Sequence, residues 1–343
     1  VRIYSVDPNT RVLSFVSSVS EGTNGIDALK GVNQLFLSPD ESFLYTISPL
    51  DDCIAWFKRN SDSGMLEFEG SVRDGVDGVD GLDGGGNYYF PPNDSTLYIV
   101  NSSQNSVCWF SMDTNSGVLD FKGIIQNGIN GITGLDNPSF FQFSVDGQYA
   151  YLIGKDDNTV SCLSRDSATG ALILKNQIHN SQVLNNVSQF TFDSNFSYAY
   201  ARSWKNDSIA WFSRNAVTGI LTLEDYVKND VNGVSEFDGP GTMYFTKSET
   251  KLYVPTSEDD SIVWFDRNES TGSLTFRGIV KDNLNGVDGL DGIGSCLFNE
   301  NETTFFVTSS VENSIAWFSK NLSTGDLSFK GIIGGSESNV VGL

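Results

Sequence analysis

Acidic, glycine-rich segments recur along the chain and contain residue types that bind hard cations. They read EGTNGIDALKGV, DGVDGVDGLDGGG, NGINGITGLDNP, DVNGVSEFDGPG and NLNGVDGLDGIG. Calcium prefers several oxygen ligands in a flexible cage, and carboxylates beside glycine-freed carbonyls supply such ligands. We therefore predict Ca²⁺ binding in these segments. The candidate metal ligands are Asp80, Asp83, Asp136, Asp238, Asp288 and Asp291.

A second interpretation of the same segments requires no metal. Glycine permits tight turns, an apolar residue can pack between neighbouring elements, and Asp side chains can accept hydrogen bonds from backbone N–H groups. The spacing does not match an EF-hand loop, so the pattern alone does not decide between the two interpretations.

Groups for acid–base or nucleophilic catalysis are few. The only histidine, His179, lies in a degenerate copy of the segment that reads IHNSQVLNNVS. A Ser-His-Asp triad would have to use this histidine, and the chain has no G-x-S-x-G motif. Paired carboxylates can act as they do in glycosidases, but no single pair stands out. His179 is therefore the only candidate catalytic residue, and Ca²⁺ is the only predicted cofactor.

The elements that must position these segments repeat with a period near 50 residues. The steps between matching residues are 53, 53, 53, 49, 53 and 53. A period of this length that contains four short strands is typical of a β-propeller blade. The matching residues are Ile3, Trp56, Trp109, Cys162, Trp211, Trp264 and Trp317.

One period, residues 33–72, contains four predicted strands. Each is short, rich in aromatic and β-branched residues, and bounded by Asn, Asp, Gly or Pro. All four side chains of IAWF in the third strand are apolar, so both of its faces should be covered and Trp56 should pack between blades. The four predicted strands are Asn33–Pro39, Phe43–Ser48, Cys53–Lys58 and Met65–Val72.

The segments SPDESFLYTIS, SVDGQYAYLIG, DDSIVWFDRNESTGSLTF and DGVDGLDG resemble the β-propeller lactonase-like family, which includes 6-phosphogluconolactonase-type propellers. The resemblance extends over essentially the whole chain. It implies blades whose first strand lines a central channel, with the acidic segments around one mouth of that channel. The residues following the aligned apolar position would then surround the mouth: Lys30, Asp83, Asp136, Asn185, Asp238 and Asp291.

The resemblance also implies lactone hydrolysis by convergent Arg, His and acidic side chains at the channel mouth. No Arg recurs in the acidic segments, and Lys30 is the only cation at the aligned position. These catalytic roles therefore cannot be assigned to individual residues of this chain.

The strand count predicts an all-β, seven-bladed propeller of four-stranded repeats that forms one domain over residues 1–343. The chain begins with a strand pair, Arg2–Val6 and Val12–Val19, that matches the outer half of a blade. It ends with Asn339–Leu343, which resembles the start of a first strand. We predict that the closing blade is shared between the termini. Its missing strand could come from residues outside the given sequence, or from a neighbouring molecule by strand addition, which would produce a polymer.

Charge excludes several kinds of partner. The chain has 43 acidic and 21 basic side chains, a formal net charge of −22 that repels phosphate backbones. No run of apolar residues is long enough to span a membrane. Four cysteines fit no zinc pattern and are predicted to be buried small hydrophobic residues: Cys53, Cys108, Cys162 and Cys296.

Sequons for N-glycosylation lie mostly in predicted turns, where a glycan would be exposed. Together with the acidic surface, they lead us to expect an extracellular or cell-surface glycoprotein. The candidate glycosylation sites are Asn93, Asn101, Asn195, Asn206, Asn268, Asn301 and Asn321.

The regular repeats and the scarcity of catalytic groups favour a non-enzymatic structural or interaction module. Such a module would self-associate or bind other extracellular proteins or glycans, for example in a surface assembly or filament. Two alternatives stay open. One is a lactone hydrolase of the 6-phosphogluconolactonase-like type, and the other is a Ca²⁺-dependent binder of carbohydrate or another small polar ligand.

Overall fold

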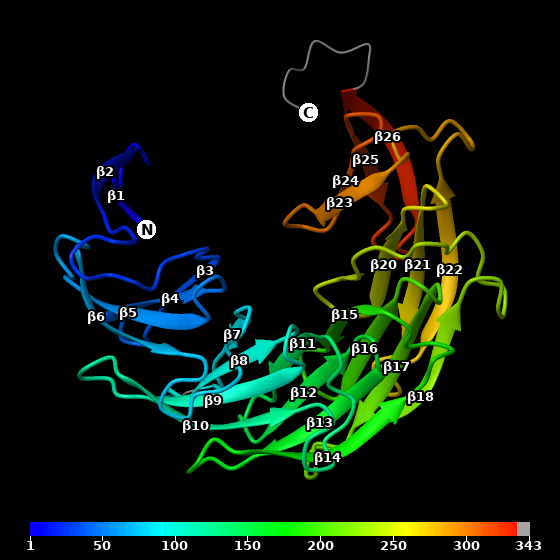
Figure 1. The fold of residues 1–343 in the computed structure, drawn as a ribbon. Coiled ribbons are helices and arrows are strands. Elements are labelled where there is room, and N and C mark those ends of the chain that lie inside the picture. The colour runs from blue at the N-terminus through cyan, green and yellow to red at the C-terminus, as the bar shows by residue number, and fades with distance from the viewer. Residues whose placement is uncertain (93, 335–343) are drawn as a thin grey trace. The chain divides into compact units, whose positions relative to one another are not determined.

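The computed structural model describes residues 1–92 and 94–334, which contain 26 strands and no helix. They form one two-stranded sheet and six four-stranded sheets in which each strand pairs with the next along the chain (Figure 1). This confirms the predicted all-β, seven-bladed propeller built from four-stranded repeats. No helix in the described ranges is long and apolar enough to cross a membrane. The chain divides into two compact units, Val1–Gln177 and Ile178–Leu343.

The first unit begins with the two-stranded sheet of β1 (Arg2–Val6) and β2 (Leu13–Ser18). Blade 1 then contains β3 (Gln34–Leu37), β4 (Phe43–Ser48), β5 (Cys53–Arg59) and β6 (Leu66–Arg73). Blade 2 contains β7 (Asn87–Tyr89), β8 (Leu97–Asn101), β9 (Ser106–Met112) and β10 (Leu119–Gln126). Blade 3 contains β11 (Pro138–Phe143), β12 (Tyr149–Gly154), β13 (Thr159–Arg165) and β14 (Leu172–His179), whose last two residues belong to the second unit.

The second unit contains three further blades. Blade 4 consists of β15 (Val187–Phe192), β16 (Tyr198–Ser203), β17 (Ser208–Arg214) and β18 (Leu221–Lys228). Blade 5 consists of β19 (Tyr244–Phe245), β20 (Lys251–Thr256), β21 (Ser261–Arg267) and β22 (Leu274–Lys281). Blade 6 consists of β23 (Ile293–Phe298), β24 (Thr304–Ser309), β25 (Ser314–Lys320) and β26 (Leu327–Gly334).

The four strands predicted for residues 33–72 are confirmed as β3 to β6, with ends that differ by at most two residues. The predicted N-terminal strand pair is confirmed as β1 and β2. The predicted closing strand, Asn339–Leu343, lies outside the described residues, so its pairing stays a prediction.

The repeated tryptophan packs between blades, as predicted. Trp56 is 6% exposed and lies in one apolar cluster with blade 2 residues such as Leu97 and Phe110. A glycine at a β-bulge of the fourth strand lies against the indole ring, where a Cβ would come within 2.3–2.7 Å of it. The glycines are Gly70, Gly123, Gly278 and Gly331, opposite Trp56, Trp109, Trp264 and Trp317.

Buried tyrosines in the second strands join consecutive blades through hydrogen bonds. Each hydroxyl donates to the carbonyl of a glycine in the turn between the third and fourth strands of the next blade. The pairs are Tyr45–Gly117 at 2.8 Å, Tyr98–Gly170 at 2.6 Å, Tyr200–Gly272 at 2.8 Å and Tyr253–Gly325 at 2.6 Å. The same polar contact thus recurs inside the otherwise apolar layer between blades.

Candidate functional site

The predicted acidic segments form the loops that connect one blade to the next, and a polar residue at the start of each segment, or immediately before it, closes the loop. Its side chain accepts a hydrogen bond from the backbone N–H of the buried apolar residue eight positions later. The acceptor–donor pairs are Glu21–Leu29 at 2.8 Å, Asp74–Leu82 at 2.8 Å, Asn127–Leu135 at 3.2 Å, Asn229–Phe237 at 3.1 Å and Asp282–Leu290 at 3.0 Å. These side chains stabilise the turn geometry, as the interpretation without metal expected.

A second side chain also anchors each loop, and it lies in the turn between the second and third strands of the following blade. This side chain accepts a hydrogen bond from the backbone N–H of the residue that follows the buried apolar residue. The pairs are Asp51–Lys30 at 2.8 Å, Gln104–Asp83 at 3.2 Å, Asp157–Asp136 at 2.9 Å, Asn206–Asn185 at 2.8 Å and Asp259–Asp238 at 2.7 Å. In blade 6 the carboxylate of Glu312 accepts from the backbone of Asp291.

The six predicted metal ligands occupy different environments. Asp80 and Asp83 are exposed on the loop before blade 2. The Asp136 Oδ1 accepts from Asn105 Nδ2 at 2.7 Å, and the Asp238 Oδ1 accepts from Asn229 Nδ2 at 2.5 Å. Asp288 belongs to a three-carboxylate cluster with Asp282 and Glu312, and Asp291 adjoins that cluster.

Two clusters of three carboxylates occur among the described residues, and they occupy the same positions of two repeats. Each has its oxygens within 4.8 Å of one another. One consists of Glu21, Asp27 and Asp51, and the other of Asp282, Asp288 and Glu312, each 261 positions later. Sequence inspection of the loops alone misses Asp51 and Glu312, because these residues come from a turn of the following blade.

Electrostatics differ between the two clusters. In the first, the Lys30 ammonium contacts all three carboxylates, and its hydrogen bond to Asp51 is the main cause of its raised pKa. In the second, burial and then repulsion from neighbouring carboxylates raise the pKa of Asp282 and of Glu312. Glu312 also has a buried Oε2 without a hydrogen-bond partner among the described residues.

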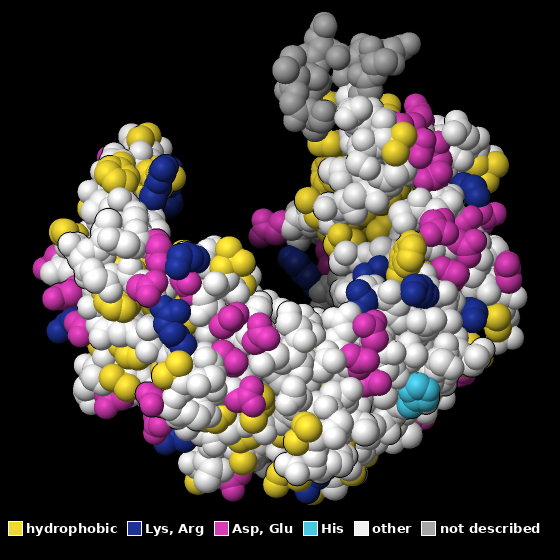
Figure 2. Space-filling model, in the orientation of Figure 1, with side chains coloured by type: hydrophobic (Ala, Val, Ile, Leu, Met, Phe, Trp, Pro, Cys, Tyr) yellow, Lys and Arg dark blue, Asp and Glu magenta, His cyan; other side chains and the backbone are white. Residues whose placement is uncertain are grey.

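The structure corrects the placement of His179. This histidine was expected in the degenerate loop, but it is the last residue of strand β14, and its side chain is exposed (Figure 2). Strand β14 therefore extends two residues, Ile178 and His179, into the segment that the sequence analysis assigned to the loop.

A partly buried arginine that the sequence analysis missed, Arg202, lies in strand β16. Arg202 is paired in register with Gln189 of β15, and its Nη1 donates to the carbonyl oxygen of Pro240. Its Nε is buried and has no hydrogen-bond partner in the described part of the chain. Burial lowers the pKa of this guanidinium, and no carboxylate contributes an opposing effect. The other repeats have Ile47, Val100, Ile153, Pro255 and Thr308 at this position.

Two further residues, Trp204 and Asp238, lie two positions in sequence from Arg202 and from Pro240 respectively. Trp204, two residues after Arg202, is 43% exposed, whereas Trp211 of the regular series is 5% exposed. Asp238 precedes Pro240 by two residues, and burial, followed by repulsion from Asp207 and Asp259, raises the pKa of its carboxyl. An arginine, an exposed indole and a protonatable carboxyl therefore belong to adjoining segments of blades 4 and 5.

Gln189 fixes which face of blade 4 carries Arg202. Its Oε1 accepts a hydrogen bond at 2.7 Å from the backbone N–H of Met243, which begins the inner part of blade 5. Since Arg202 donates to Pro240 in the same connecting segment, both side chains point into the space between blades 4 and 5. The sequence signal for this site was the replacement of an aliphatic strand residue by arginine.

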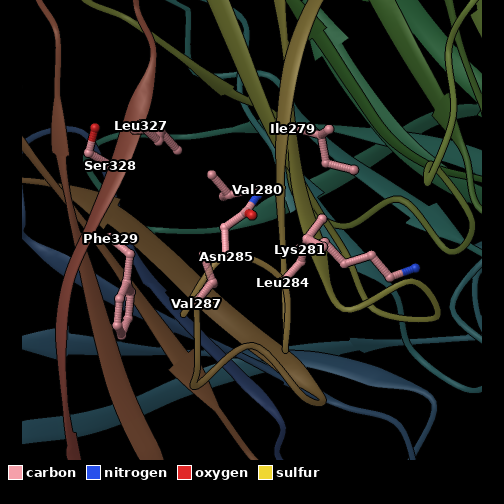
Figure 3. A pocket seen from close by; sticks show the side chains of 9 residues that line it. All are labelled: Ile279, Val280, Lys281, Leu284, Asn285, Val287, Leu327, Ser328 and Phe329. Carbon is pink, nitrogen blue, oxygen red and sulfur yellow. The ribbon is translucent and has the colours of Figure 1, made fainter.

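Shallow grooves also recur on the outer strands. One of about 330 Å³ lies between β22, the following loop and β26, and its lining includes Leu284, Asn285 and Val287 of the loop and Phe329 of β26 (Figure 3). A groove of about 200 Å³ occupies the equivalent place between β18 and β22. Both result from the same packing of adjacent outer strands, so neither distinguishes one repeat as a site.

The burial predicted for the four cysteines is confirmed. Asn101 is 1% exposed, and its Nδ2 donates to the carbonyls of Gly81 and Asp83, so a glycan there would require these bonds to break. Asn195, Asn268, Asn301 and Asn321 are exposed, Asn206 is partly buried, and Asn93 lies outside the described residues. Glycan occupancy and extracellular location stay predictions.

The fold and the Arg202 site together define a β-propeller with a partly buried arginine between blades 4 and 5, which forms no ion pair with the described residues. Residues 76–188 and 185–282, more than half of the chain, match the family described as Lactonase, 7-bladed beta-propeller. The chain therefore belongs to this family, as its sequence resemblance implied. No curated protein matches the sequence.

Solved structures share this fold at low sequence identity. A periplasmic gluconolactonase of Pseudomonas aeruginosa is 14% identical, with a TM-score of 0.55 over 97% of this chain and 92% of that one. A candidate 6-phosphogluconolactonase of Bacteroides uniformis is 17% identical, with a TM-score of 0.56 over 97% and 92%. Sqt1 of Saccharomyces cerevisiae is 12% identical, with a TM-score of 0.59 over 97% and 79%. These similarities establish the fold and leave the activity to the site.

Proposed function

We propose that this protein is a lactone hydrolase that acts on a sugar lactone with an anionic group. The observation that carries the proposal is Arg202, a half-buried guanidinium without a carboxylate partner in residues 1–92 and 94–334. Such a cation is costly to bury unless a ligand supplies the opposite charge. Its fork of donors suits a phosphate, a carboxylate or the oxyanion that forms during lactone opening.

The adjoining groups fit the remaining requirements of this reaction. The exposed indole of Trp204 supplies an apolar face for the C–H surface of a sugar ring. Asp238, with its raised pKa, takes a proton from the attacking water and returns it to the ring oxygen as the C–O bond breaks. The product is the open sugar acid. Membership of the lactonase family supports this function over the structural module expected from the sequence.

The test is hydrolysis of 6-phosphogluconolactone and of gluconolactone at mildly acidic pH, where spontaneous opening is slow. Arg202→Met should lower kcat/KM by roughly 10²-fold, since one donor to the developing oxyanion is lost, and should leave the fold intact because other repeats have apolar residues there. If kcat/KM falls further with 6-phosphogluconolactone than with gluconolactone, the guanidinium of Arg202 binds the phosphate group. Thr308→Met, the matched change in blade 6, should have no effect.

Two outcomes contradict the proposal. One is a wild-type protein that opens neither lactone faster than buffer does, and the other is an Arg202→Met variant with unchanged kcat/KM. Self-association as a structural module, which size-exclusion chromatography would reveal, and binding of extracellular partners stay predictions from the sequence.

A further inference from the structure

We propose that this protein carries N-linked glycans at four asparagines of blades 4 to 6, all at the end of these blades opposite Arg202. Each asparagine begins an Asn-x-Ser/Thr sequon, the motif at which an oligosaccharide is joined to the asparagine Nδ2. Turns favour Asn and Ser for other reasons, so the role of each side chain in the fold shows which sequons are free to accept a glycan. The four sites are Asn195, Asn268, Asn301 and Asn321.

In the turns between the third and fourth strands, the fold uses the side-chain oxygen of the first residue and not its nitrogen. The Asn268 Oδ1 accepts the backbone N–H groups of Ser270 and Thr271 at 2.9 and 3.2 Å, and the equivalent asparagine of blade 6 does the same. An aspartate makes these two bonds in blades 2 and 3. The Ser270 hydroxyl also donates to Asn268 at 2.7 Å, but Ala168 and Val217 occupy its position in blades 3 and 4. The turn therefore needs neither the amide nitrogen nor the hydroxyl of the sequon.

In the turns between the first and second strands, a neighbouring residue has taken over the structural role of the sequon asparagine. In blade 1, the Asp40 Oδ1 accepts from the Ser38 hydroxyl and from the Ser42 backbone, at 2.6 and 3.2 Å. In blade 4, Asp193 stands at the Ser38 position and accepts the two backbone N–H groups that end the turn, at 2.7 and 3.0 Å. Blade 6 repeats this arrangement at 2.8 and 3.0 Å. Asn195, at the Asp40 position, therefore has no part in closing the turn.

All four acceptor amides are accessible. Within residues 1–92 and 94–334, the Nδ2 of none of them donates a hydrogen bond, and each asparagine side chain is exposed. The hydroxyl residue that completes each sequon is exposed as well, so a transferase can contact both ends of the motif. These hydroxyl residues are Ser197, Ser270, Thr303 and Ser323.

The sequons at the other end of the blades are engaged by the fold. Asn101 is 1% exposed, and its Nδ2 donates to two backbone carbonyls. Asn206 is partly buried, and the Ser208 of its sequon has no exposed surface and donates to the Val183 carbonyl at 3.1 Å. Asn186 is partly buried, and the middle residue of its sequon is 1% exposed. A glycan at any of these three positions would have to displace packed or hydrogen-bonded groups.

Strand order places the two groups of sequons at opposite ends of a blade. Consecutive strands are antiparallel, so the first and third turns lie at one end, and the second turn and the connecting loop lie at the other. In blade 4, Asn195 precedes Tyr198 at the start of β16, and Arg202 lies four residues further, roughly 13 Å along the strand. Glu249 of blade 5 accepts from the Ser194 backbone of blade 4 at 2.8 Å, which keeps the glycan-bearing turns of neighbouring blades together. The glycans would therefore cover one end of these blades and leave the Arg202 end accessible.

The modification requires a lipid-linked oligosaccharide diphosphate as the donor. The asparagine nitrogen attacks C1 of the first sugar, the bond between C1 and the diphosphate oxygen breaks, and the nitrogen loses one proton as the N–C1 bond forms. The lipid diphosphate leaves. Each site gains a bulky polar group, which only a surface position tolerates.

The test maps glycans on the protein isolated from its native cells and on the full chain secreted from cultured eukaryotic cells. Peptide-N-glycosidase converts each glycosylated Asn to Asp, which mass spectrometry locates. We expect conversion at the four proposed sites and none at Asn101, Asn186 or Asn206. Four single variants should each lose one glycan and keep the wild-type Tm, because they remove an exposed hydroxyl and retain the asparagine. These variants are Ser197→Ala, Ser270→Ala, Thr303→Ala and Ser323→Ala.

Val217→Thr is the matched control, because it completes a sequon at Asn215, the blade 4 equivalent of Asn268. The Asn215 Oδ1 makes the same two turn bonds, and Val217 is 84% exposed, so this variant should gain one glycan. The proposal is overturned if the native protein carries no glycan at the four sites, or if the folded protein carries glycans equally at Asn101 and Asn206. A Val217→Thr variant without a further glycan would also overturn it, because an exposed turn asparagine would then not suffice.

Discussion

Replacing Tyr200 by Phe should weaken the contact between blades 4 and 5 more than Tyr253→Phe weakens the contact between blades 5 and 6. Both tyrosines have no exposed surface. The Tyr200 hydroxyl donates to the Gly272 carbonyl at 2.8 Å, and the Tyr253 hydroxyl donates to the Gly325 carbonyl at 2.6 Å. To this extent the two substitutions remove the same interaction, worth about 1 kcal/mol.

The difference between them comes from Arg267. Its Nε donates to the Tyr200 hydroxyl, and its side chain is 2% exposed and paired with Asp193 at 2.6 Å. At the equivalent place in blade 6, the Lys320 ammonium lies 5.8 Å from the centre of the Tyr253 ring, over its face. Tyr200→Phe therefore also removes an acceptor from a buried cation, which costs about 1.5–3 kcal/mol. We expect losses of about 1 kcal/mol for Tyr253→Phe and about 2.5–4 kcal/mol for Tyr200→Phe.

Urea unfolding followed by tryptophan fluorescence and far-UV circular dichroism measures both values. A double-mutant cycle of Tyr200→Phe with Arg267→Met isolates the bond between the two side chains, and its coupling energy should exceed about 1 kcal/mol. Equal destabilisation by the two Tyr→Phe substitutions, or a coupling energy near zero, would refute the reasoning, since Arg267 would then not depend on the hydroxyl.

Three other predictions concern packing, alkaline pH and thiol reactivity. Gly278→Ala should lower the free energy of unfolding by about 1–3 kcal/mol, because its Cβ would lie 2.3 Å from the Trp264 ring. Gly286→Ala should lower it by about 1 kcal/mol, because its Cβ would meet nothing within 4 Å but its φ is 80°. Urea titration measures both values. Burial raises the pKa of Tyr98 and of Tyr200 from 10 to about 12. The unfolded chain therefore loses these protons first, so the stability is intact below pH 10 and falls between pH 10 and 12 by up to about 1.4 kcal/mol per pH unit for each tyrosine. Urea midpoints measured against pH should show this decline, and Tyr98→Phe should reduce its slope. Burial also raises the pKa of the Cys53 thiol to about 11, so a disulfide reagent at about pH 8 should modify no cysteine before unfolding and all four afterwards; reaction in the folded protein would contradict the burial.

The sequence predicts the blades well because their construction is periodic. Strand boundaries follow turn residues, and four of the repeated tryptophans, Trp56, Trp109, Trp264 and Trp317, lie opposite glycines that leave room for the indole. The loops are predicted less completely. Asp282 and Asp288 are close in sequence, but Glu312 joins them only because strands β23 and β24 return the chain to the same end of the blade. A contact that depends on this return has no local sequence signal.

Arg202 could have been found from the sequence, but only by comparing strand positions as well as loops. The aligned residues are Ile47, Val100, Ile153, Pro255 and Thr308, so an arginine is the single charged residue in that series. Its hydrogen bond to Pro240 and its unpartnered Nε could not have been predicted, because they depend on how blade 4 packs against the next connecting loop. His179 was misplaced for a related reason, since the length of β14 depends on pairing with β13.

In a repeat protein, the residues at equivalent positions of different blades show what the fold requires at that position. At the Arg202 position, five other copies pack without a buried charge, and at the Asp291 position, one copy neutralises its carboxylates with Lys30. Both arrangements leave no buried polar atom without a partner at that position, and such an atom would lower the free energy of unfolding by about 1–3 kcal/mol. The chain nevertheless retains such an atom at Arg202 Nε and another at Glu312 Oε2. Because apolar or uncharged residues fit the same backbone position in the other blades, an anion beside Arg202 accounts for this arginine better than folding does.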